Sequence, residues 1–371
     1  MKRRPYRVLL VLLSQTFGGA EARVLAQAQA FQDRVERCAV AVLKNSPLHR
    51  RLQQMGLPVE PIGSGRGSPV TLFAIRRIIK AGGYNVVDAH NVQSILWGHL
   101  AAWLSGVQGS VTTVHSDFGK EYPGLKGQLY EAVLALDRYL TDQYVTVTEV
   151  LQHKIEQQGD ANRSTLIHNA VHVPPEPFAG VDPAQRRAWG FTGDDFVVAI
   201  VARLKPVKGH RYLFEALAHL HDLPQLKLLV AGDGPLRDDL EALAHQLQIA
   251  DRVHFAGFVR DIPDLMRAVD VVCLASLSEA LPYVVLEAAA CARPLLVTRV
   301  GGMATLLEHQ VNAVLVPPGD SLALAEALRW MVAHPERTRQ LGLAAYDLVR
   351  QSFSVEQMVT RVLGVYDRAM Q

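Results

Sequence analysis

Short apolar runs alternate with longer amphipathic stretches along most of the chain. The runs are rich in β-branched residues and predict strands, whereas the stretches between them have the helical spacing of apolar positions. The expected strands are 8–13, 37–43, 86–90, 110–115 and 144–148 in the first half, and 196–202, 226–231, 253–255, 271–275 and 295–298 in the second. This alternation is typical of parallel sheets that helices cover on both faces, so we predict an α/β fold.

The alternation lapses once, in the proline-rich stretch 173–177, which reads as a linker. The 371 residues also exceed what one hydrophobic core usually fills. We therefore expect two Rossmann-like domains with parallel sheets, 1–170 and 171–353. The last segment, 354–371, reads as one helix.

Two fixed cations, Arg203 and Lys208, fall in a loop between the apolar strand 196–201 and a helix that opens at Gly209. The N–H groups at a helix start, together with two cations, would suit a pyrophosphate. The alternative is an ordinary surface loop that happens to carry an Arg and a Lys.

Two carboxylates lie eight residues apart, Glu279 in the loop after strand 271–275 and Glu287 beyond Pro282. Because proline suits a first helical turn, Glu287 should lie inside a helix. A carboxylate there can accept hydrogen bonds from the two hydroxyls of a ribose, and Glu279 would lie at the strand end where ligands of parallel sheets collect. The alternative is a pair of exposed glutamates.

The first half offers two further candidates. Gly18 and Gly19 stand between the first strand and its helix, where the backbone could approach a phosphate closely, although a Gly-Gly pair is otherwise just a turn. His115 ends a strand and should lie at the carboxyl edge of the sheet, where it could bind a ligand or serve only structure. For His90, at the end of another strand, we expect a structural role.

Composition narrows the class of protein. With 49% hydrophobic and 20% charged residues the chain is an ordinary globular one, and a net charge of +2 makes no case for nucleic acid as a partner. Cys38, Cys273 and Cys291 lack metal-ligand or disulfide spacing, so we expect packed thiols in a reducing compartment, the cytoplasm.

Membrane signals are weak. The basic residues 2–4 precede an apolar run, but the run is short and breaks at Ser14, so a buried first strand explains it better than a secretory signal. The stretch 71–80 combines apolar residues with Arg76, Arg77 and Lys80, and could dock on the inner face of the cytoplasmic membrane. Packing of this helix on the sheet is the preferred interpretation.

Three segments occur in an informative order. They are Ala-Arg-Leu-Lys-Pro-Val-Lys-Gly at 202–209, Ala-Gly-Asp-Gly-Pro-Leu at 231–236, and Ser-Glu-Ala-Leu-Pro at 278–282 with Glu287 beyond it. Together they resemble the donor half of glycosyltransferase family 4, whose architecture, called GT-B, has two Rossmann-like domains that face a cleft. The resemblance continues through 17–21, 86–90, 112–116, 166–170 and 300–302, and thus covers most of the chain.

The resemblance implies a retaining, metal-independent glycosyltransferase without a cofactor. It would move a sugar from a nucleotide diphosphate sugar, a UDP-sugar in preference to a GDP-sugar, to a hydroxyl of a glycan or lipid-linked acceptor in the synthesis of cell-envelope polysaccharide or glycolipid. The first domain would bind the acceptor, the second would bind the nucleotide-sugar, and the last helix would cross back to the first domain.

The resemblance also assigns residues to roles. The catalytic set is His115, Glu279, Arg203 and Lys208, and the donor-binding set is Gly18, Gly19, Arg203, Lys208, Gly232, Glu279, Ala280, Leu281 and Glu287. Glu279 could be a nucleophile, as in retaining glycosidases. We favour the other mechanism, in which the leaving phosphate deprotonates the acceptor while the two cations stabilise its charge. His115 would form a hydrogen bond to the sugar or the phosphate.

Alanine replaces the glycine usual in the family at 170, 280, 292 and 313. If such a position requires a positive φ, an alanine is strained by about 1 to 2 kcal/mol. The alternative function is therefore a non-catalytic GT-B protein that binds nucleotide or glycan as partner of an active transferase. The retained Arg203, Lys208, Glu279, Glu287 and His115 favour an enzyme.

Overall fold

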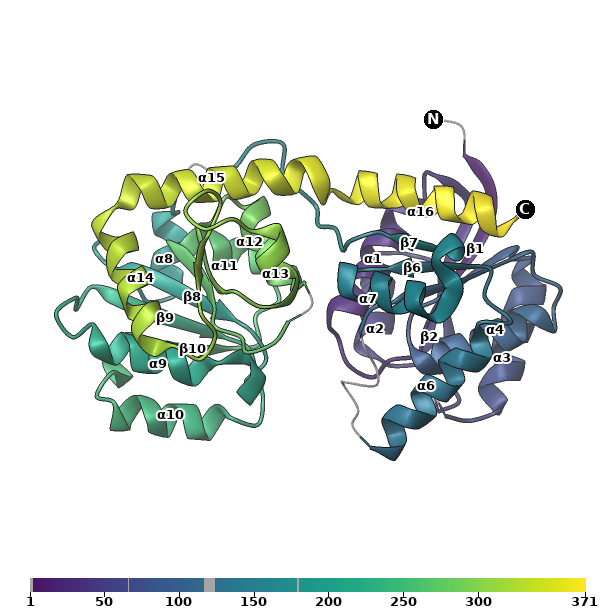
Figure 1. Cartoon of the computed structure of the whole chain (residues 1–371), viewed down its shortest axis with the longest axis horizontal. Helices are drawn as coiled ribbons and strands as arrows, with labels where there is room; N and C mark the ends of the chain where they lie inside the picture. The colour runs from purple at the N-terminus through teal and green to yellow at the C-terminus, as the bar shows by residue number, and fades with distance from the viewer. Residues whose placement is uncertain (1–2, 66, 117–123, 179, 280) are drawn as a thin grey trace. The chain divides into compact units, whose positions relative to one another are not determined.

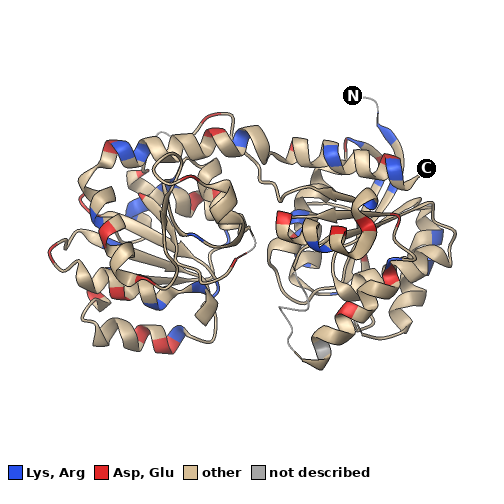
Figure 2. Ribbon diagram, in the orientation of Figure 1, with Lys and Arg blue, Asp and Glu red and all other residues tan. Residues whose placement is uncertain are grey.

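The computed structural model describes residues 3–65, 67–116, 124–178, 180–279 and 281–371 (Figure 1). The chain forms two compact units, the first made of residues 1–170 together with 355–371 and the second of residues 171–354. Each unit is a parallel sheet between two layers of helices, which confirms the predicted fold class. Charged residues of both signs lie mainly on the helices and loops of each unit (Figure 2).

The sheet of the first unit has seven strands in the order β3-β2-β1-β4-β5-β6-β7, all parallel. The order reverses between β1 and β4, the place where ligands of doubly wound sheets bind at the carboxyl ends. The strands are β1 Arg4–Leu12, β2 Val35–Leu43, β3 Val59–Ile62, β4 Val86–Ala89, β5 Gly109–Val114, β6 Gln143–Thr146 and β7 Ser164–Leu166.

Alternate residues of β1 enter different cores, because successive side chains of a strand point to opposite faces. Val8 and Leu10 pack with α1 Gly19–Phe31, α2 Pro47–Gln54 and α16 Val355–Ala369, whereas Leu9 and Val11 pack with α3 Val70–Gly82 and α4 Val92–Trp103. The second face also carries α6 Leu125–Asp137 and α7 Glu149–Ile155.

The sheet of the second unit has six parallel strands in the order β10-β9-β8-β11-β12-β13. They are β8 Phe196–Val201, β9 Leu226–Ala231, β10 Val253–Gly257, β11 Val271–Leu274, β12 Leu295–Thr298 and β13 Val314–Val316. One face packs on α9 His210–His219, α10 Arg237–Gln246 and α14 Ser321–Ala333. The other face packs on α8 Pro183–Ala188, α11 Ile262–Ala268, α12 Tyr283–Ala290, α13 Gly301–Leu306 and α15 Pro335–Ser352.

All ten predicted strands are present. The described residues form three further strands, β3, β7 and β13, which were not predicted from the sequence. The strands β4 and β5 end one residue earlier than expected, so His90 and His115 each directly follow a strand.

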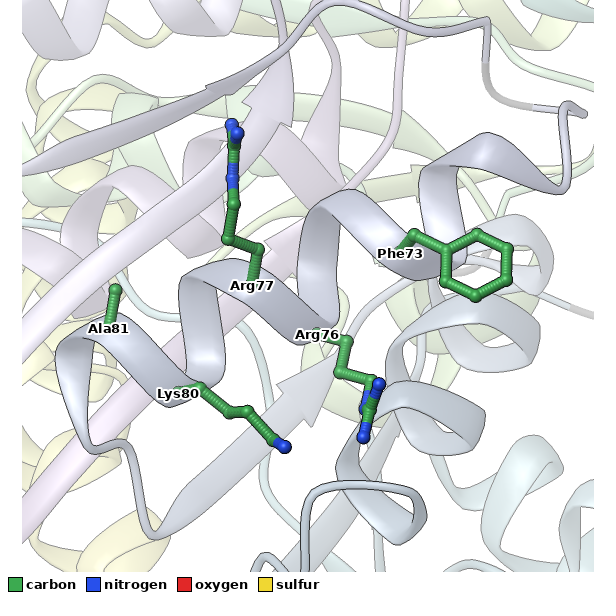
Figure 3. A pocket seen from close by; sticks show the side chains of 5 residues that line it. All are labelled: Phe73, Arg76, Arg77, Lys80 and Ala81. Atoms are coloured by element: carbon green, nitrogen blue, oxygen red, sulfur yellow. The ribbon is translucent and has the colours of Figure 1, made fainter.

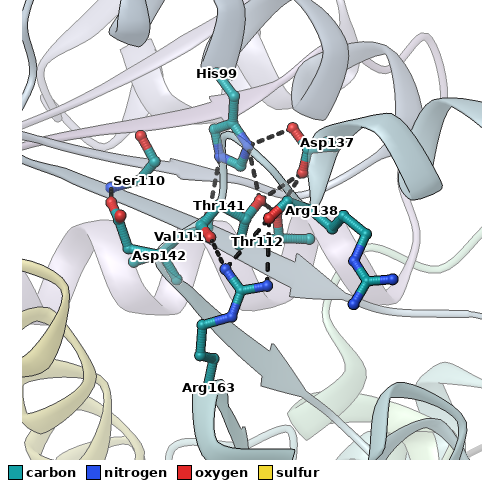
Figure 4. Close-up of polar contacts among 9 residues, drawn as sticks. All are labelled: His99, Ser110, Val111, Thr112, Asp137, Arg138, Thr141, Asp142 and Arg163. Carbon is teal, nitrogen blue, oxygen red and sulfur yellow. Dashed lines mark hydrogen bonds and ion pairs between the residues drawn. The ribbon is translucent and has the colours of Figure 1, made fainter. Parts of the chain in front are cut away.

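A buried polar cluster joins α4, α6 and β5 on one face of the first sheet (Figure 4). His99 Nδ1 lies 2.8 Å from Asp137 Oδ1, and His99 Nε2 lies 3.1 Å from the carbonyl oxygen of Val111. The hydroxyl of Thr112 donates to Asp137 Oδ2 at 3.1 Å. Burial by itself would lower the pKa of His99, but the neighbouring Asp137 carboxylate outweighs it, so the pKa is raised.

The alanines that replace family glycines differ in backbone conformation. Ala292 has a φ of 53°, so the expected strain applies there. Among the described residues with positive φ, neither Ala170 nor Ala313 occurs, and Ala280 lies outside the described residues.

The three cysteines are buried free thiols, as predicted from their apolar surroundings. Burial raises the pKa of Cys291 to about 12, and it also raises the pKa of Cys38 and Cys273. These thiols are therefore poor nucleophiles at neutral pH.

Candidate functional site

Glycines bring the loops at the carboxyl edge of the second sheet into close contact. A Cβ on Gly209, which has a φ of 68°, would lie 1.9 Å from the carbonyl oxygen of Ala275. A Cβ on Gly232, with a φ of 141°, would lie 2.0 Å from the carbonyl oxygen of Ala202. Only glycine allows both the conformation and the approach, so the loops after β8, β9 and β11 depend on these two positions.

An ion pair connects two of the predicted catalytic residues. Lys208 Nζ, in the loop after β8, donates to Glu279 Oε1, in the loop after β11, although the two residues are 71 positions apart. Ser276 Oγ donates to the same oxygen at 2.9 Å. The side chains of Lys208 and Glu279 are only 18% and 10% exposed, and Leu277 N donates to Val207 O at 2.8 Å, which ties the loops together. The sequence did not indicate the role of Ser276.

The other predicted residues of this unit lie around the same edge. Arg203 follows β8 and is exposed, so its guanidinium is accessible to a ligand. Leu281 is 7% exposed and packs in the core. Glu287 lies inside α12 and is half-buried, and Ala280 is outside the described residues.

His210, the first residue of α9, was not predicted as part of the site. Its side chain is buried, with 2% of the residue exposed, and neither ring nitrogen has a hydrogen-bond partner within the described part of the chain. Burial, with a smaller effect of Lys208, lowers the pKa of His210 to about 4. A neutral, buried imidazole therefore lies two residues after Lys208, close enough for the lysine charge to affect its pKa. The Gly-His pair after Lys208 was the available sequence signal.

The start of α1 is occupied by an acidic side chain. The amide of Gly18 donates to Glu21 Oε2 at 2.8 Å, and Glu21 is 6% exposed. A carboxylate at this position already stabilises the helix dipole and would repel a second anion. A phosphate at Gly18 and Gly19 thus stays a prediction, and it would have to displace or share this contact.

His115 belongs to a row of polar side chains at the carboxyl ends of β4 and β5. His115 Nε2 lies 3.0 Å from His90 Nδ1, and the rings are 5.3 Å apart between centroids. On its other side, His90 Nε2 lies 3.5 Å from Asp88 Oδ1. His90, for which we expected a structural role, is therefore in direct contact with His115.

Comparison with known proteins identifies the family. Residues 17–173 match the family described as Glycosyltransferase Family 4, and residues 181–348 match the one described as Glycosyl transferases group 1. An uncharacterized glycosyltransferase of Methanocaldococcus jannaschii is 31% identical over 272 residues, which are 70% of each chain. The chain belongs to glycosyltransferase family 4.

One further relative and one solved structure are informative for this family 4 glycosyltransferase. The Escherichia coli protein named UDP-Gal:alpha-D-GlcNAc-diphosphoundecaprenol alpha-1,3-galactosyltransferase is 25% identical over 269 residues, 70% of this chain and 69% of that protein. The crystal structure of the Anabaena protein HepE, in complex with UDP and glucose, superposes with a TM-score of 0.84 over 98% of this chain and 99% of that one, at 24% identity. This likeness shows that the family 4 glycosyltransferase has the GT-B fold.

The neutral histidines of the glycosyltransferase predict sensitivity to acid. Burial lowers the pKa of His90 to about 4 and lowers that of His115, as it does for His210. The unfolded chain therefore binds more protons below its ordinary histidine pKa of about 6.5, and stability falls as the pH drops from 6.5 to 4. His90 and His210 each contribute about 3 kcal/mol to this loss, since one pKa unit corresponds to about 1.4 kcal/mol.

Urea unfolding of the wild type and of His210→Gln at pH 7 and pH 5 checks this expectation. The variant should lose less stability between the two pH values than the wild type does. His99→Gln is the control, because the raised pKa of His99 gives stability that is complete below pH 6.5 and is lost only as pH rises. Equal losses in the wild type and His210→Gln would contradict the prediction.

Proposed function

We propose that this glycosyltransferase moves a sugar from a UDP-sugar to a hydroxyl of a glycan or lipid-linked acceptor, in the synthesis of cell-envelope polysaccharide or glycolipid. The Anabaena structure contains UDP and glucose, and the name of the Escherichia coli relative states a UDP donor and a lipid-linked acceptor. Both support UDP as the nucleotide. The second unit would bind the donor and the first unit the acceptor.

The cluster of Lys208, Glu279 and Ser276 carries the proposal. A half-buried lysine paired with a carboxylate is a site that an anionic ligand can take over, because a diphosphate offers more charge and more acceptor atoms than one carboxylate. With Lys208 turned to the diphosphate, Glu279 becomes available to accept hydrogen bonds from sugar hydroxyls. The exposed Arg203 would supply the second cation, Gly232 the close approach of the backbone, and Glu287 an acceptor for the ribose.

Retention of the anomeric configuration follows from the favoured mechanism. The acceptor oxygen forms its bond to the anomeric carbon on the face from which the phosphate departs, and the acceptor proton passes to an oxygen of the departing phosphate. Arg203 and Lys208 stabilise the charge that develops on the diphosphate, so neither a metal ion nor a covalent intermediate is required. The contacts of Glu279 with Lys208 and Ser276 support a binding role for this carboxylate.

Calorimetric titration of the folded protein with UDP, GDP and ADP tests the donor class without knowledge of the acceptor. We expect UDP to bind at least tenfold more tightly than GDP or ADP. Preference for GDP or ADP would reject the UDP assignment. Binding of none of the three, by protein shown to be folded, would favour the non-catalytic alternative.

We further propose that α3 contacts an anionic membrane surface where a lipid-linked acceptor is held. Ile75 and Ile79 are buried against the sheet, so packing on the sheet, the preferred interpretation, accounts for one side of the helix. The outer side presents Phe73, which is 63% exposed, together with Arg77 and Lys80 (Figure 3). An aromatic side chain beside cations suits the interface of an anionic bilayer. Within the described residues, no helix is long and apolar enough to cross a membrane.

The double variant Arg77→Ala/Lys80→Ala should bind phosphatidylglycerol-containing vesicles about 30-fold less tightly than the wild type in a sedimentation assay, since each cation contributes about 1 kcal/mol near an anionic surface. Arg337→Ala/Arg339→Ala on α15, a helix with charges of both signs (Figure 2), removes the same charge elsewhere and is the matched control. Equal sedimentation of the two double variants would show that α3 has no special role.

A further inference from the structure

A buried carboxylate, Asp88 on β4, lies next to the pair of histidines at the edge of the first sheet. Asp88 is 0% exposed. Its Oδ2 accepts hydrogen bonds from the Tyr366 hydroxyl of α16 at 2.7 Å and from Gln27 Nε2 of α1 at 3.1 Å. Its Oδ1 accepts from the Thr113 hydroxyl at 2.8 Å and lies 3.5 Å from His90 Nε2. A carboxylate surrounded by donors in this way acts only as an acceptor.

The acceptor role of Asp88 fixes where the protons of the two histidines lie. His90 Nε2 lies 3.5 Å from Asp88 Oδ1 without a formed hydrogen bond, and the negative charge of the carboxylate favours the proton on this nitrogen, so that His90 Nδ1 has the lone pair. His90 Nδ1 then accepts from His115 Nε2, 3.0 Å away, which must carry the proton of that ring. The remaining nitrogen, His115 Nδ1, is therefore left with a lone pair.

Both rings are neutral at physiological pH. Burial lowers the pKa of His90 to about 4 and that of His115 well below its ordinary value. The positive charge of Arg23 on α1 acts in the same direction on both histidines, whereas Asp88 opposes it at His90. The row from Asp88 to His115 thus holds one negative charge at its buried end and two neutral imidazoles.

We propose that Asp88 is a positioning residue that acts through His90 to hold His115 in the Nε2–H tautomer, so that His115 Nδ1 accepts a hydrogen bond from a sugar hydroxyl. The hydrogen bond from a sugar hydroxyl rests on the proposed function, whereas the assignment of the His115 tautomer is independent of it. From the sequence we expected His115 to form a hydrogen bond to the sugar or to the phosphate. An unprotonated Nδ1 repels a phosphate oxygen, so the expected partner is a sugar hydroxyl.

The chain contains a matched control for Asp88. Thr112 and Thr113 are neighbours on β5, and their side chains point to opposite faces of the sheet. The hydroxyl of Thr113 donates to Asp88, whereas that of Thr112 donates to Asp137, as Figure 4 shows for the second pair. Asp137 is also a buried carboxylate, 4% exposed, with threonine and histidine partners, but its histidine is His99. Asp137→Asn should therefore destabilise the first unit much as Asp88→Asn does, without any effect on His115.

Nitrogen-15 NMR of the histidine rings of the full chain tests the proposal without donor, acceptor or activity. We expect His90 and His115 in the wild type to be neutral and protonated on Nε2 at pH 7. In Asp88→Asn the loss of the carboxylate charge should give a mixture of tautomers at both rings, and Asp137→Asn should leave both unchanged. Protonation of His115 on Nδ1 in the wild type, or unchanged tautomers in Asp88→Asn, would overturn the proposal. This result would hold whether or not the protein transfers a sugar from UDP-sugars.

Kinetic measurements distinguish a positioning role of Asp88 from a purely structural one. Asp88→Asn should lower kcat for hydrolysis of the preferred UDP-sugar at least tenfold while the Kd for UDP stays within about twofold, and Asp137→Asn should change neither. Equal losses of kcat in the two variants would assign Asp88 a structural role only. If Asp88→Asn does not fold, His90→Phe replaces it, because an aromatic ring is kept while His115 loses its acceptor, and a mixture of tautomers at His115 and the same loss of kcat are expected.

Discussion

Lys208→Ala should weaken the binding of UDP by about 10- to 100-fold and lower kcat/KM for sugar transfer by at least as much. A charge-assisted hydrogen bond contributes about 1.5 to 3 kcal/mol, and a tenfold change in affinity corresponds to about 1.4 kcal/mol. The further loss of rate arises because the leaving diphosphate gains charge in the transition state, when the cation matters most. The variant also leaves Glu279, 10% exposed at its side chain, without its cationic partner, so that among the described residues only Ser276 still donates to it.

Calorimetry with UDP and steady-state kinetics of donor hydrolysis measure the two effects of Lys208→Ala. Lys205→Ala is the control, because Lys205 is an exposed cation of the same loop, and it should change UDP affinity no more than about twofold. Equal losses in the two variants would mean that only the general positive charge of the loop matters. Unchanged affinity in Lys208→Ala would reject the pyrophosphate site.

Among glycine-to-alanine substitutions near the site, Gly209→Ala should cause the largest loss in the free energy of unfolding. The new Cβ would lie 1.9 Å from the carbonyl oxygen of Ala275, on a backbone with a φ of 68°. The positive φ alone costs an alanine about 1 to 2 kcal/mol, and relief of the clash requires the loops after β8 and β11 to separate. We expect a total loss of about 3 kcal/mol or more, together with loss of UDP binding.

Gly190→Ala isolates the contribution of the backbone to the effect of Gly209→Ala. Gly190 has a φ of 82°, but no atom of the described residues lies within 4 Å of the position that a Cβ would take there. Only the conformational strain is therefore expected, about 1 kcal/mol. The free energy of unfolding in urea measures both variants, and UDP titration measures the site. If Gly209→Ala costs no more than Gly190→Ala, the close approach of the two loops does not matter for stability.

Most of the strands that the sequence indicates have long apolar runs, although the edge strand β10 was predicted from only three residues, 253–255. The strands that were missed are short and lie at sheet edges. The strand β3 contains an exposed proline, Pro61, and β7 is half-buried throughout. Both exposures arise because each strand has a neighbour on one side only. The strand β13 is fully buried but has three residues, too few for a period to be recognised. An edge strand is defined by the sheet it joins, which local sequence does not encode.

The sequence indicated different parts of the candidate site in the two units. The family pattern selects Lys208 and Glu279, but their ion pair depends on how two loops meet across the sheet, which the spacing of 71 residues leaves open. The contact of His90 with His115 could have been inferred, since both follow strands that pair directly, β4 with β5. The partner of the Gly18 amide, Glu21, follows from the three-residue spacing of a capping box.

The last helix, α16, has a consequence for how the protein is made. Its residues Met358, Val362 and Tyr366 are buried in the core of the first unit, where Tyr366 also binds Asp88. A ribosome releases these residues only after it has synthesised all of residues 171–354, which form a continuous unit. The second unit can therefore fold during translation. The core of the first unit stays incomplete until α16 is released, so we expect chaperones to bind the apolar residues of the first unit in nascent chains.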